Sequence, residues 1–164
     1  MSKSTRQKKS ESTPSKVVTS LDEINGICAR PLKVRFQYAG VTMELETRHL
    51  TPKESELLKL QLDEAMPPII KGKTEAEDRF DFGNIEYQRK RTRIERECRA
   101  QAIFWATKAF QEKRPDLVEG MYNPAYRERI VDFVQSMLTE AIHEIIYEAI
   151  VNPEVSVPEL VNFT

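Results

Sequence analysis

The longest helical pattern in the chain runs from Pro124 to Val151. Its first turns place apolar side chains on one side of a helical wheel and polar side chains on the other. The apolar arc is wide, which is typical of a helix that packs on a globular core rather than of a narrow coiled-coil seam. Asn123 is a good N-cap, and Asn152 precedes a proline, which disfavours further helix. The sequence therefore predicts one helix here with a face in the core.

The last turns of this predicted helix depart from the pattern. Ile146, Tyr147 and Ile150 fall on the side that is polar in the earlier turns. A helix that is apolar nearly all round must be covered from more than one direction. We therefore expect a protein interface at this end. Phe104 and Trp105, on the preceding helical pattern, are expected to belong to the core or to the same interface.

A second long helical pattern spans Ile85 to Gln111, and Pro115 ends it. Its first half is charged, whereas its second half carries a wide apolar stripe. Two helices joined by a connection of about ten residues can lie antiparallel as a helical hairpin. The two patterns together predict a body of two long antiparallel helices.

The charged half of the second pattern is rich in arginine, and Arg89, Arg93 and Arg96 form a candidate basic face. Residues 1–20 add five basic residues against one acid. Such clusters can attract nucleic acid. A solvated helix face held by Glu–Arg pairs explains the same arginines, and neither an aromatic platform nor a helix-turn-helix accompanies them. Nucleic-acid binding is therefore the alternative interpretation.

Residues 32–47 alternate between apolar and polar side chains on both sides of a bend, which predicts a β-hairpin. One register places Phe36 opposite Met43 and Arg35 opposite Glu44. A slip by one residue would lose both the apolar and the charged matches. The pattern therefore specifies a single register.

Ala39 and Gly40 lie at the bend of this hairpin. A two-residue type I′ turn would force Ala39 to positive φ, so we expect a wider, four-residue loop. After the hairpin, Thr51 as N-cap and Glu54 three residues later form a capping box that begins a short, leucine-rich helix. We expect this helix to cover the apolar face of the hairpin, because a two-stranded unit is not stable alone.

The sequence thus predicts an α+β fold that is mostly α, with an N-terminal β-hairpin packed on a short helix and followed by two long antiparallel helices. Residues 1–20 are predicted to be a disordered basic tail. Residues 21–152 are predicted to be a single helical domain that contains the hairpin at 32–47. Residues 153–164 are predicted to be an extended arm that folds back on the apolar end of the last helix.

Residues 71–83 are polar and are predicted to be a loop, with Phe80 and Phe82 as its anchors. A Gly-Lys-Thr triplet and an Asp-Phe-Gly triplet lie here, at 72–74 and 81–83. The first lacks the upstream glycine of a phosphate-binding loop, and the second lacks the other kinase motifs. Neither triplet predicts nucleotide chemistry.

His49, His143, Cys28 and Cys98 provide no metal-ligand spacing and no motif for a catalytic nucleophile. We therefore expect a protein that is not an enzyme and needs no metal or cofactor. The two distant cysteines are typical of reduced thiols in a cytoplasmic protein. The chain shows no signal-peptide pattern and no apolar run that could span a bilayer, so no membrane contact is expected.

The hairpin stretch VRFQYAGVTMELETRHL leads directly into TPKESELLKL. This order resembles the tail assembly chaperones of long-tailed bacteriophages and prophages. Many of those proteins open with a short hairpin that ends in a leucine–threonine/serine–x–x–glutamate entry to the first helix. Residues 50–54, Leu-Thr-Pro-Lys-Glu, stand in that position. The resemblance covers residues 32–66.

The resemblance implies a non-enzymatic role in virion assembly in the cytoplasm of a host cell. Such a protein would coat the long tape measure protein, help to recruit tail-tube subunits and form homo-oligomers. Surplus apolar helix surface and opposite charge at the two ends of the chain are compatible with self-association. Two alternatives stay open: a nucleic-acid-binding accessory protein that uses the basic tail and the arginine face, and a structural or adaptor subunit of the virion.

Overall fold

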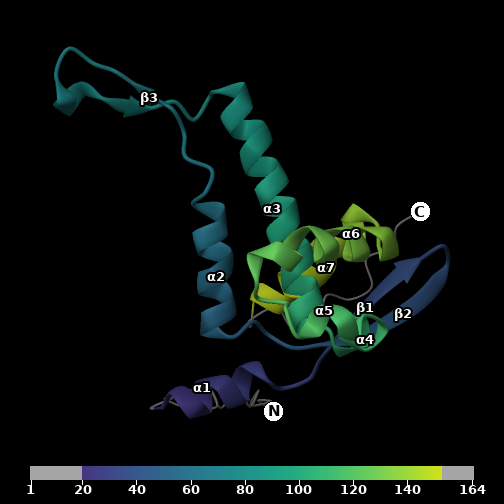
Figure 1. Cartoon of the computed structure of the whole chain (residues 1–164). Coiled ribbons are helices and arrows are strands. Elements are labelled where there is room, and N and C mark those ends of the chain that lie inside the picture. The colour runs from purple at the N-terminus through teal and green to yellow at the C-terminus, as the bar shows by residue number, and fades with distance from the viewer. Residues whose placement is uncertain (1–19, 153–164) are drawn as a thin grey trace, which may run out of the picture.

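The computed structural model describes residues 20–152, and the predicted basic tail and C-terminal arm lie outside the described residues. Helices dominate, and two small antiparallel hairpins accompany them, which confirms an α+β fold that is mostly α (Figure 1). The elements, in chain order, are α1 Leu21–Cys28, β1 Leu32–Tyr38, β2 Val41–Thr47, α2 Pro52–Leu62, β3 Ile69–Ile70, the 3-10 turn η1 Glu75–Glu77, β4 Arg79–Phe80, α3 Ile85–Ala106, α4 Lys108–Lys113, α5 Pro115–Val118, the 3-10 turn η2 Pro124–Tyr126, α6 Arg127–Met137 and α7 Glu140–Val151.

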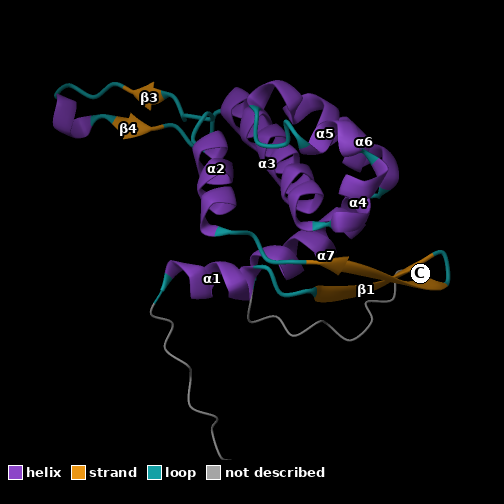
Figure 2. Cartoon of the chain, turned by 60° about the horizontal axis from the view of Figure 1, so that its bottom comes forward, coloured by secondary structure: helices purple, strands orange, loops and turns teal. Residues whose placement is uncertain are grey.

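The long helix α3 is the centre of the fold, and α2, α6 and α7 all pack on it (Figure 2). Its last two turns are wholly buried, and Ile103 and Phe104 are fully inaccessible to solvent. Phe133 of α6 meets Phe104 edge to face, with ring centroids 6.1 Å apart. Burial of this much apolar surface on one helix makes α3 the main source of hydrophobic stabilisation.

The chain from Pro124 to Val151 is not the single helix that its pattern predicted. Leu138 and Thr139 are extended, with ψ values of 147° and 158°, and they separate α6 from α7. Such a break changes the phase of the helical wheel, so α7 turns a new set of positions toward the core. The buried positions of α7 recur at helical spacing and are Ile142, His143, Ile146, Ala149 and Ile150. Ile146, Tyr147 and Ile150, which fall on the polar side of a single-helix wheel, were therefore the sign of a second helix.

The second predicted helix also ends early. α3 stops at Ala106, and an extended Thr107 separates it from α4. The two long antiparallel helices of our expectation are therefore one long helix, α3, with the shorter α6 and α7 packed on it. Residues 21–28, for which we had no expectation, form α1.

The hairpin has the predicted register, with Phe36 opposite Met43 and Arg35 opposite Glu44. The expectation of a four-residue loop is wrong, because Ala39 and Gly40 alone make the turn, with φ values of 50° and 77°. Two positive φ values are the signature of a type I′ turn, whose twist matches that of the strands. The hairpin also makes its main helix contacts with α7 and α4 instead of with α2.

His143 joins the two helices on either side of the break. Its ring is buried, and Nε2 lies 3.2 Å from the carbonyl oxygen of Val134. A carbonyl oxygen can only accept, so Nε2 carries the proton of this bond. The helical wheel of a single helix had placed His143 on the polar face, and the re-phased α7 places it in the core.

Burial of His143 predicts a loss of stability in mild acid. Burial lowers the pKa of His143 below its usual value of 6.5, and the bond to Val134 opposes this shift only in part. The unfolded chain then binds a proton more readily than the folded chain, so stability falls as the pH drops below about 6.5. We expect the His143→Gln variant, which keeps an N–H donor, to lose less stability than the wild type between pH 7 and pH 5 in urea denaturation. Equal losses in the two proteins would contradict this role for His143.

Candidate protein-binding site

An arm projects from the helical body between α2 and α3 (Figures 1 and 2). The arm comprises residues 66–85 and contains the short strands β3 and β4 and the turn η1. The strands pair antiparallel, with Ile69 opposite Phe80 and Ile70 opposite Arg79. Apart from each other, β3 and β4 make no extensive contact with another element of residues 20–152. Both sides of the arm are therefore open to solvent.

The arm exposes a concentration of large apolar side chains. Six of them are at least half exposed: Met66, Ile69, Ile70, Phe80, Phe82 and Ile85. Single exposed apolar residues are common on soluble proteins, but six within one segment of twenty residues are typical of a site that another molecule covers. The arm is therefore the best candidate for a functional surface in the described part of the chain.

Polar bonds within the arm hold its shape. The carboxylate of Asp78 accepts from the Lys71 ammonium at 3.0 Å and from the Gly72 N–H at 2.9 Å. At the base, the Asp81 N–H donates to the Pro68 carbonyl at 2.7 Å. These bonds connect the outgoing and returning strands at two levels. The apolar side chains are thus presented on a preorganised scaffold, which reduces the entropy lost on binding.

An aromatic cluster connects the returning strand to α3. Phe82 lies between Phe80 and Tyr87, with ring centroids 6.0 and 6.1 Å apart. The side chain of Gln88 donates to the Phe82 carbonyl at 3.1 Å. Asn84 caps α3 by accepting from the Tyr87 N–H at 3.0 Å. The direction of the arm is therefore set by the first turn of the central helix.

The sequence predicted only a loop at 71–83, with Phe80 and Phe82 as its anchors. The structure corrects this, because both rings are more than half exposed. The sequence did contain a signal that these apolar residues are exposed. Two prolines, Pro67 and Pro68, precede two isoleucines in a stretch that is otherwise polar. The apolar residues of this stretch belong to no helix or strand long enough to bury all of them. They were therefore candidates for a binding surface.

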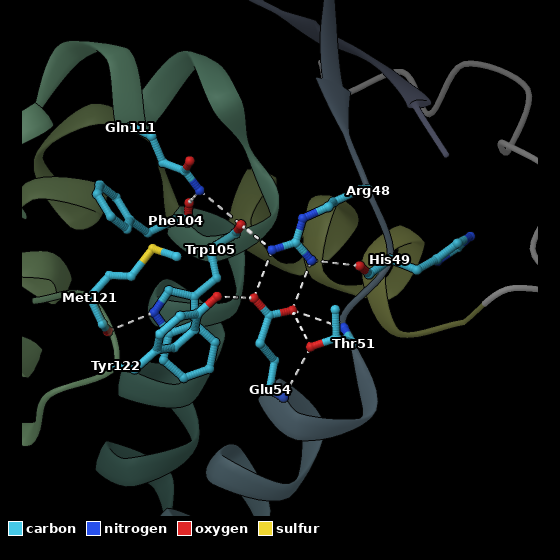
Figure 3. Close-up of polar contacts among 9 residues, drawn as sticks. All are labelled: Arg48, His49, Thr51, Glu54, Phe104, Trp105, Gln111, Met121 and Tyr122. Carbon is cyan, nitrogen blue, oxygen red and sulfur yellow. Dashed lines mark hydrogen bonds and ion pairs between the residues drawn. The ribbon is translucent and has the colours of Figure 1, made fainter. Parts of the chain in front are cut away.

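A buried ion pair holds together the elements at the start of α2, the end of this helix away from the arm (Figure 3). The guanidinium of Arg48 donates to both oxygens of Glu54, at 2.8 and 2.7 Å. The Tyr122 hydroxyl and the Thr51 N–H also donate to this carboxylate, at 2.7 and 2.8 Å. The Glu54 side chain is only 2% exposed. Glu54 completes the predicted capping box and, in addition, ties the start of α2 to two distant segments.

Arg48 also satisfies the open end of α3. Its guanidinium donates to the Trp105 carbonyl at 2.9 Å, and its backbone N–H donates to the Ala106 carbonyl at 3.0 Å. The Gln111 amide donates to the carbonyls of Phe104 and Trp105 at 3.1 and 2.9 Å. The last carbonyls of a helix lack partners within the helix and attract positive charge. This cluster therefore explains where α3 ends.

The hydrogen bonds around Glu54 stabilise the fold and fix the protonation states of the groups involved. Burial alone would raise the pKa of Glu54, but the bonds from Arg48, Thr51 and Tyr122 outweigh it and hold the pKa below its usual value. Burial and the bond to Glu54 raise the pKa of Tyr122 to about 12. Both groups thus keep fixed protonation states near neutral pH. The cluster therefore stabilises the packing of the start of α2 against the end of α3 and Tyr122.

The predicted interface at Ile146 and Ile150 is wrong, because both residues lie in the core, and Phe104 and Trp105 follow the core alternative. Phe104, Trp105, Ile146 and Ile150 are at most 2% exposed. Tyr147 is partly buried, and the Arg99 guanidinium lies 5.9 Å from its ring centre. The end of α7 does need cover from two directions, but α3 and β1 of the same chain provide it.

The predicted basic face lies along an open groove of about 880 Å³ between α3 and α6. Arg89, Arg93 and Arg96 line it together with Arg127, but Glu97, Glu128 and Asp132 line it as well. Arg93 pairs with Glu97 at 3.6 Å, and Arg96 pairs with Glu140 at 2.7 Å. The groove therefore has mixed charge, as the solvated-face interpretation expects. Contact with nucleic acid stays a prediction.

Within residues 20–152, no group of three or more His, Cys, Asp or Glu side chains could hold a metal ion. No helix in the same range combines the length and the apolar character needed to cross a membrane. Burial raises the pKa of the Cys98 thiol to about 12. In comparisons with known proteins, no family model, curated protein or solved structure gives a significant match to the chain.

Proposed function

We propose that the protein is a non-enzymatic assembly chaperone that binds an apolar segment of a partner through the arm at residues 66–85. The single observation that carries this proposal is the gathering of six exposed apolar side chains on an arm whose own polar bonds keep it ordered. An enzyme has little use for such a surface. A chaperone needs it, because apolar segments of its client must be shielded from water until assembly.

The chemistry of the arm favours a partner with an extended or helical apolar face. Near its tip the arm has one ion pair, between Lys71 and Asp78. The apolar side chains are left to provide the binding energy, with Phe80 and Phe82 as the large anchors. Residues 71–81 carry three cations and four anions, so the net charge is small. Apolar anchors combined with a small net charge select by hydrophobicity more than by sequence. This is the selectivity that a chaperone requires.

The resemblance at residues 32–66 supplies the more specific form of the proposal. The client would be the tape measure protein of a long-tailed phage, tail-tube subunits would be recruited to the complex, and assembly would proceed in the cytoplasm of the host cell. The arm begins at the last residue of that stretch, shortly after the end of α2 at Leu62. Self-association of chaperone copies along a long client belongs to the same proposal.

One observation favours the second candidate function, an accessory role at nucleic acid. The groove between α3 and α6 gathers four arginines, and Arg89 has no ion pair within residues 20–152. Nucleic-acid binding of this kind weakens steeply with salt. It would be lost on changing Arg89, Arg93 and Arg96 to Gln and would be insensitive to changes on the arm.

The test is co-expression of the full chain with the tape measure protein encoded in the same genome. The triple variant Ile70→Ser, Phe80→Ser, Phe82→Ser is expected to weaken binding about a hundredfold, because buried aromatic and aliphatic anchors each contribute more than about 1 kcal/mol. The soluble yield of the client should fall in parallel. Binding is measured by calorimetry or biolayer interferometry, and the melting temperature should not change.

The matched control is the triple variant Tyr38→Ser, Val41→Ser, Leu60→Ser. These three side chains are as exposed and apolar as the arm residues but lie on the hairpin and on α2. The control is expected to keep wild-type affinity. Equal losses in the two triple variants, or no loss in either, would overturn the assignment of the arm as the binding site.

A further inference from the structure

The open groove between α3 and α6 is walled by one face of each helix. Its charged and polar lining residues recur at steps of four and then three positions on both helices, which is the spacing of a single helix face. They are Arg89, Arg93 and Arg96 on α3, and Glu128, Asp132 and Gln135 on α6. From Ile85 to Arg96 the α3 wall is about 17 Å long, at about 1.5 Å per residue. The groove therefore has the length of about three turns of another helix.

The two walls carry opposite charges that do not neutralise each other across the groove. Arg93 and Arg96 pair with acids of α3 and α7, not with those of α6. Within residues 20–152, Arg89, Glu128 and Asp132 form no ion pair at all. An occupant that lies between the walls can therefore pair with cations on one side and with carboxylates on the other.

This arrangement disfavours a small molecule and a nucleic acid as the occupant. Small-molecule sites enclose most of their ligand, whereas the charged side chains of both walls are exposed to solvent here. The phosphates of a nucleic acid would be attracted by the arginines but repelled by Glu128 and Asp132. A polypeptide that carries both signs of charge matches both walls.

The groove is continuous with the arm. Ile85 is the last residue of the arm and also lines the groove. Gln88, whose side chain donates to the Phe82 carbonyl, lines the groove as well. A client that covers the exposed side chains of the arm therefore reaches the groove without crossing another element.

We propose that a helix of the client docks in this groove, with acidic side chains toward the arginines of α3 and basic side chains toward the carboxylates of α6. The inference rests on the proposed function, because the client of the arm provides the helix. Val131, which is buried between the two walls, would contact the apolar stripe of this helix. Helices that dock in grooves present their contacts three and four residues apart, which is also the spacing of both walls. The arm thus selects apolar segments, and the groove adds a charge pattern.

The test uses three designed helical peptides of about 18 residues, a length sufficient for measurable helix formation. All three share one apolar stripe. The mixed peptide has Glu along one edge of the stripe and Lys along the other, and the two remaining peptides have Glu on both edges or Lys on both edges. Fluorescence anisotropy with the full chain measures the affinities. The wild type is expected to bind the mixed peptide about tenfold more tightly than either of the others, because about two or three surface ion pairs distinguish the complexes.

Charge reversal on α6 should switch this preference. Glu128→Lys with Asp132→Lys makes both walls basic, so the peptide with Glu on both edges should become the tightest ligand by about the same factor. A gain of affinity cannot result from unfolding of the variant. The matched control is Glu56→Lys with Glu119→Lys, which changes the net charge equally at two exposed acids outside the groove. The control should keep the preference of the wild type.

A switch in the α6 variant alone supports the proposal. Equal affinities of the wild type for the three peptides overturn it, and so does a switch in the control variant, which would show a general attraction between opposite charges. A DNA duplex of about 20 base pairs is tested in the same assay. If it binds more tightly than the mixed peptide and displaces it, nucleic acid is the occupant and the proposal is wrong.

The arm variant Ile70→Ser, Phe80→Ser, Phe82→Ser distinguishes failure of this inference from failure of the proposed function. It keeps the groove, so its peptide preferences should equal those of the wild type. If this variant loses the client but the α6 variant shows no switch, the arm assignment stands and the groove assignment falls. If the α6 variant switches but the arm variant keeps the client, the groove assignment stands and the arm assignment falls.

Discussion

Replacing Glu54 with Gln is expected to lower the free energy of unfolding by about 3–5 kcal/mol, the cost of breaking a buried ion pair by removing one charge. All the groups that hydrogen-bond to this carboxylate are donors: the Arg48 guanidinium, the Tyr122 hydroxyl, and the N–H and hydroxyl of Thr51. The amide oxygen of Gln can still accept, but its NH₂ group would face these donors. Arg48 would also keep its charge in a largely buried position with no carboxylate to balance it.

The matched control is Glu56→Gln, which makes the same chemical change two residues away on the exposed face of α2. Urea denaturation of the control should give a value within about 0.5 kcal/mol of the wild type, as for most surface substitutions. A similar loss in both variants would show that the lost charge, rather than the buried pair, is responsible.

The pH dependence of the two proteins provides a second check. The bonds that hold the pKa of Glu54 below its usual value of 4.5 contribute stability that is fully present at neutral pH. This contribution disappears as the pH falls below 4.5 and through the lowered pKa of the folded state, because the folded carboxylate must then bind a proton. The difference in stability between wild type and Glu54→Gln should therefore shrink in acid. A constant difference down to pH 3 would contradict the role assigned to the Glu54 charge.

Glu54 also shows how far the sequence alone can lead. The spacing from Thr51 to Glu54 predicted the capping box, because both residues lie within one helical turn. The partners Arg48 and Tyr122 could not be predicted in the same way. Tyr122 is 68 residues away from Glu54. Such a contact depends on how α3 and the segments after it turn back, and no local pattern encodes that path.

The hairpin and the last helices also combine features that the sequence predicts with features that it does not. The register of β1 and β2 was predictable because apolar and charged pairs both require it. The two-residue turn was not, because the strain of a positive φ at Ala39 is outweighed by strand pairing on both sides. The break at Leu138 and Thr139 has no proline or glycine to announce it. Its only trace was the shift of Ile146 and Ile150 to the polar side of the wheel, which we interpreted as an interface.

The arm offers the sharpest single-residue test of the proposed function, at Gly72. A Cβ atom at this position would lie 2.8 Å from the backbone carbonyl carbon of Glu77 and closer still to the Glu77 Cβ. Real Cβ atoms do not approach other atoms so closely, so Gly72 and η1 must move apart when Gly72 is replaced by Ala. The separation would also break the bond from the Gly72 N–H to Asp78. The arm would then lose the preorganisation that holds its apolar side chains in place.

Gly72→Ala is therefore expected to weaken client binding about a hundredfold, as the triple change of arm side chains does, while every apolar anchor is still present. Tryptic cleavage after Lys71, Lys73 and Arg79 should accelerate, and the melting temperature of the helical body should hold, because β3 and β4 make no extensive contact with it. Gly26→Ala is the matched control, since a Cβ there meets no atom within 4 Å and alanine favours its helix. If cleavage accelerates but affinity does not change, the client binds elsewhere. If neither changes, close packing at Gly72 does not order the arm.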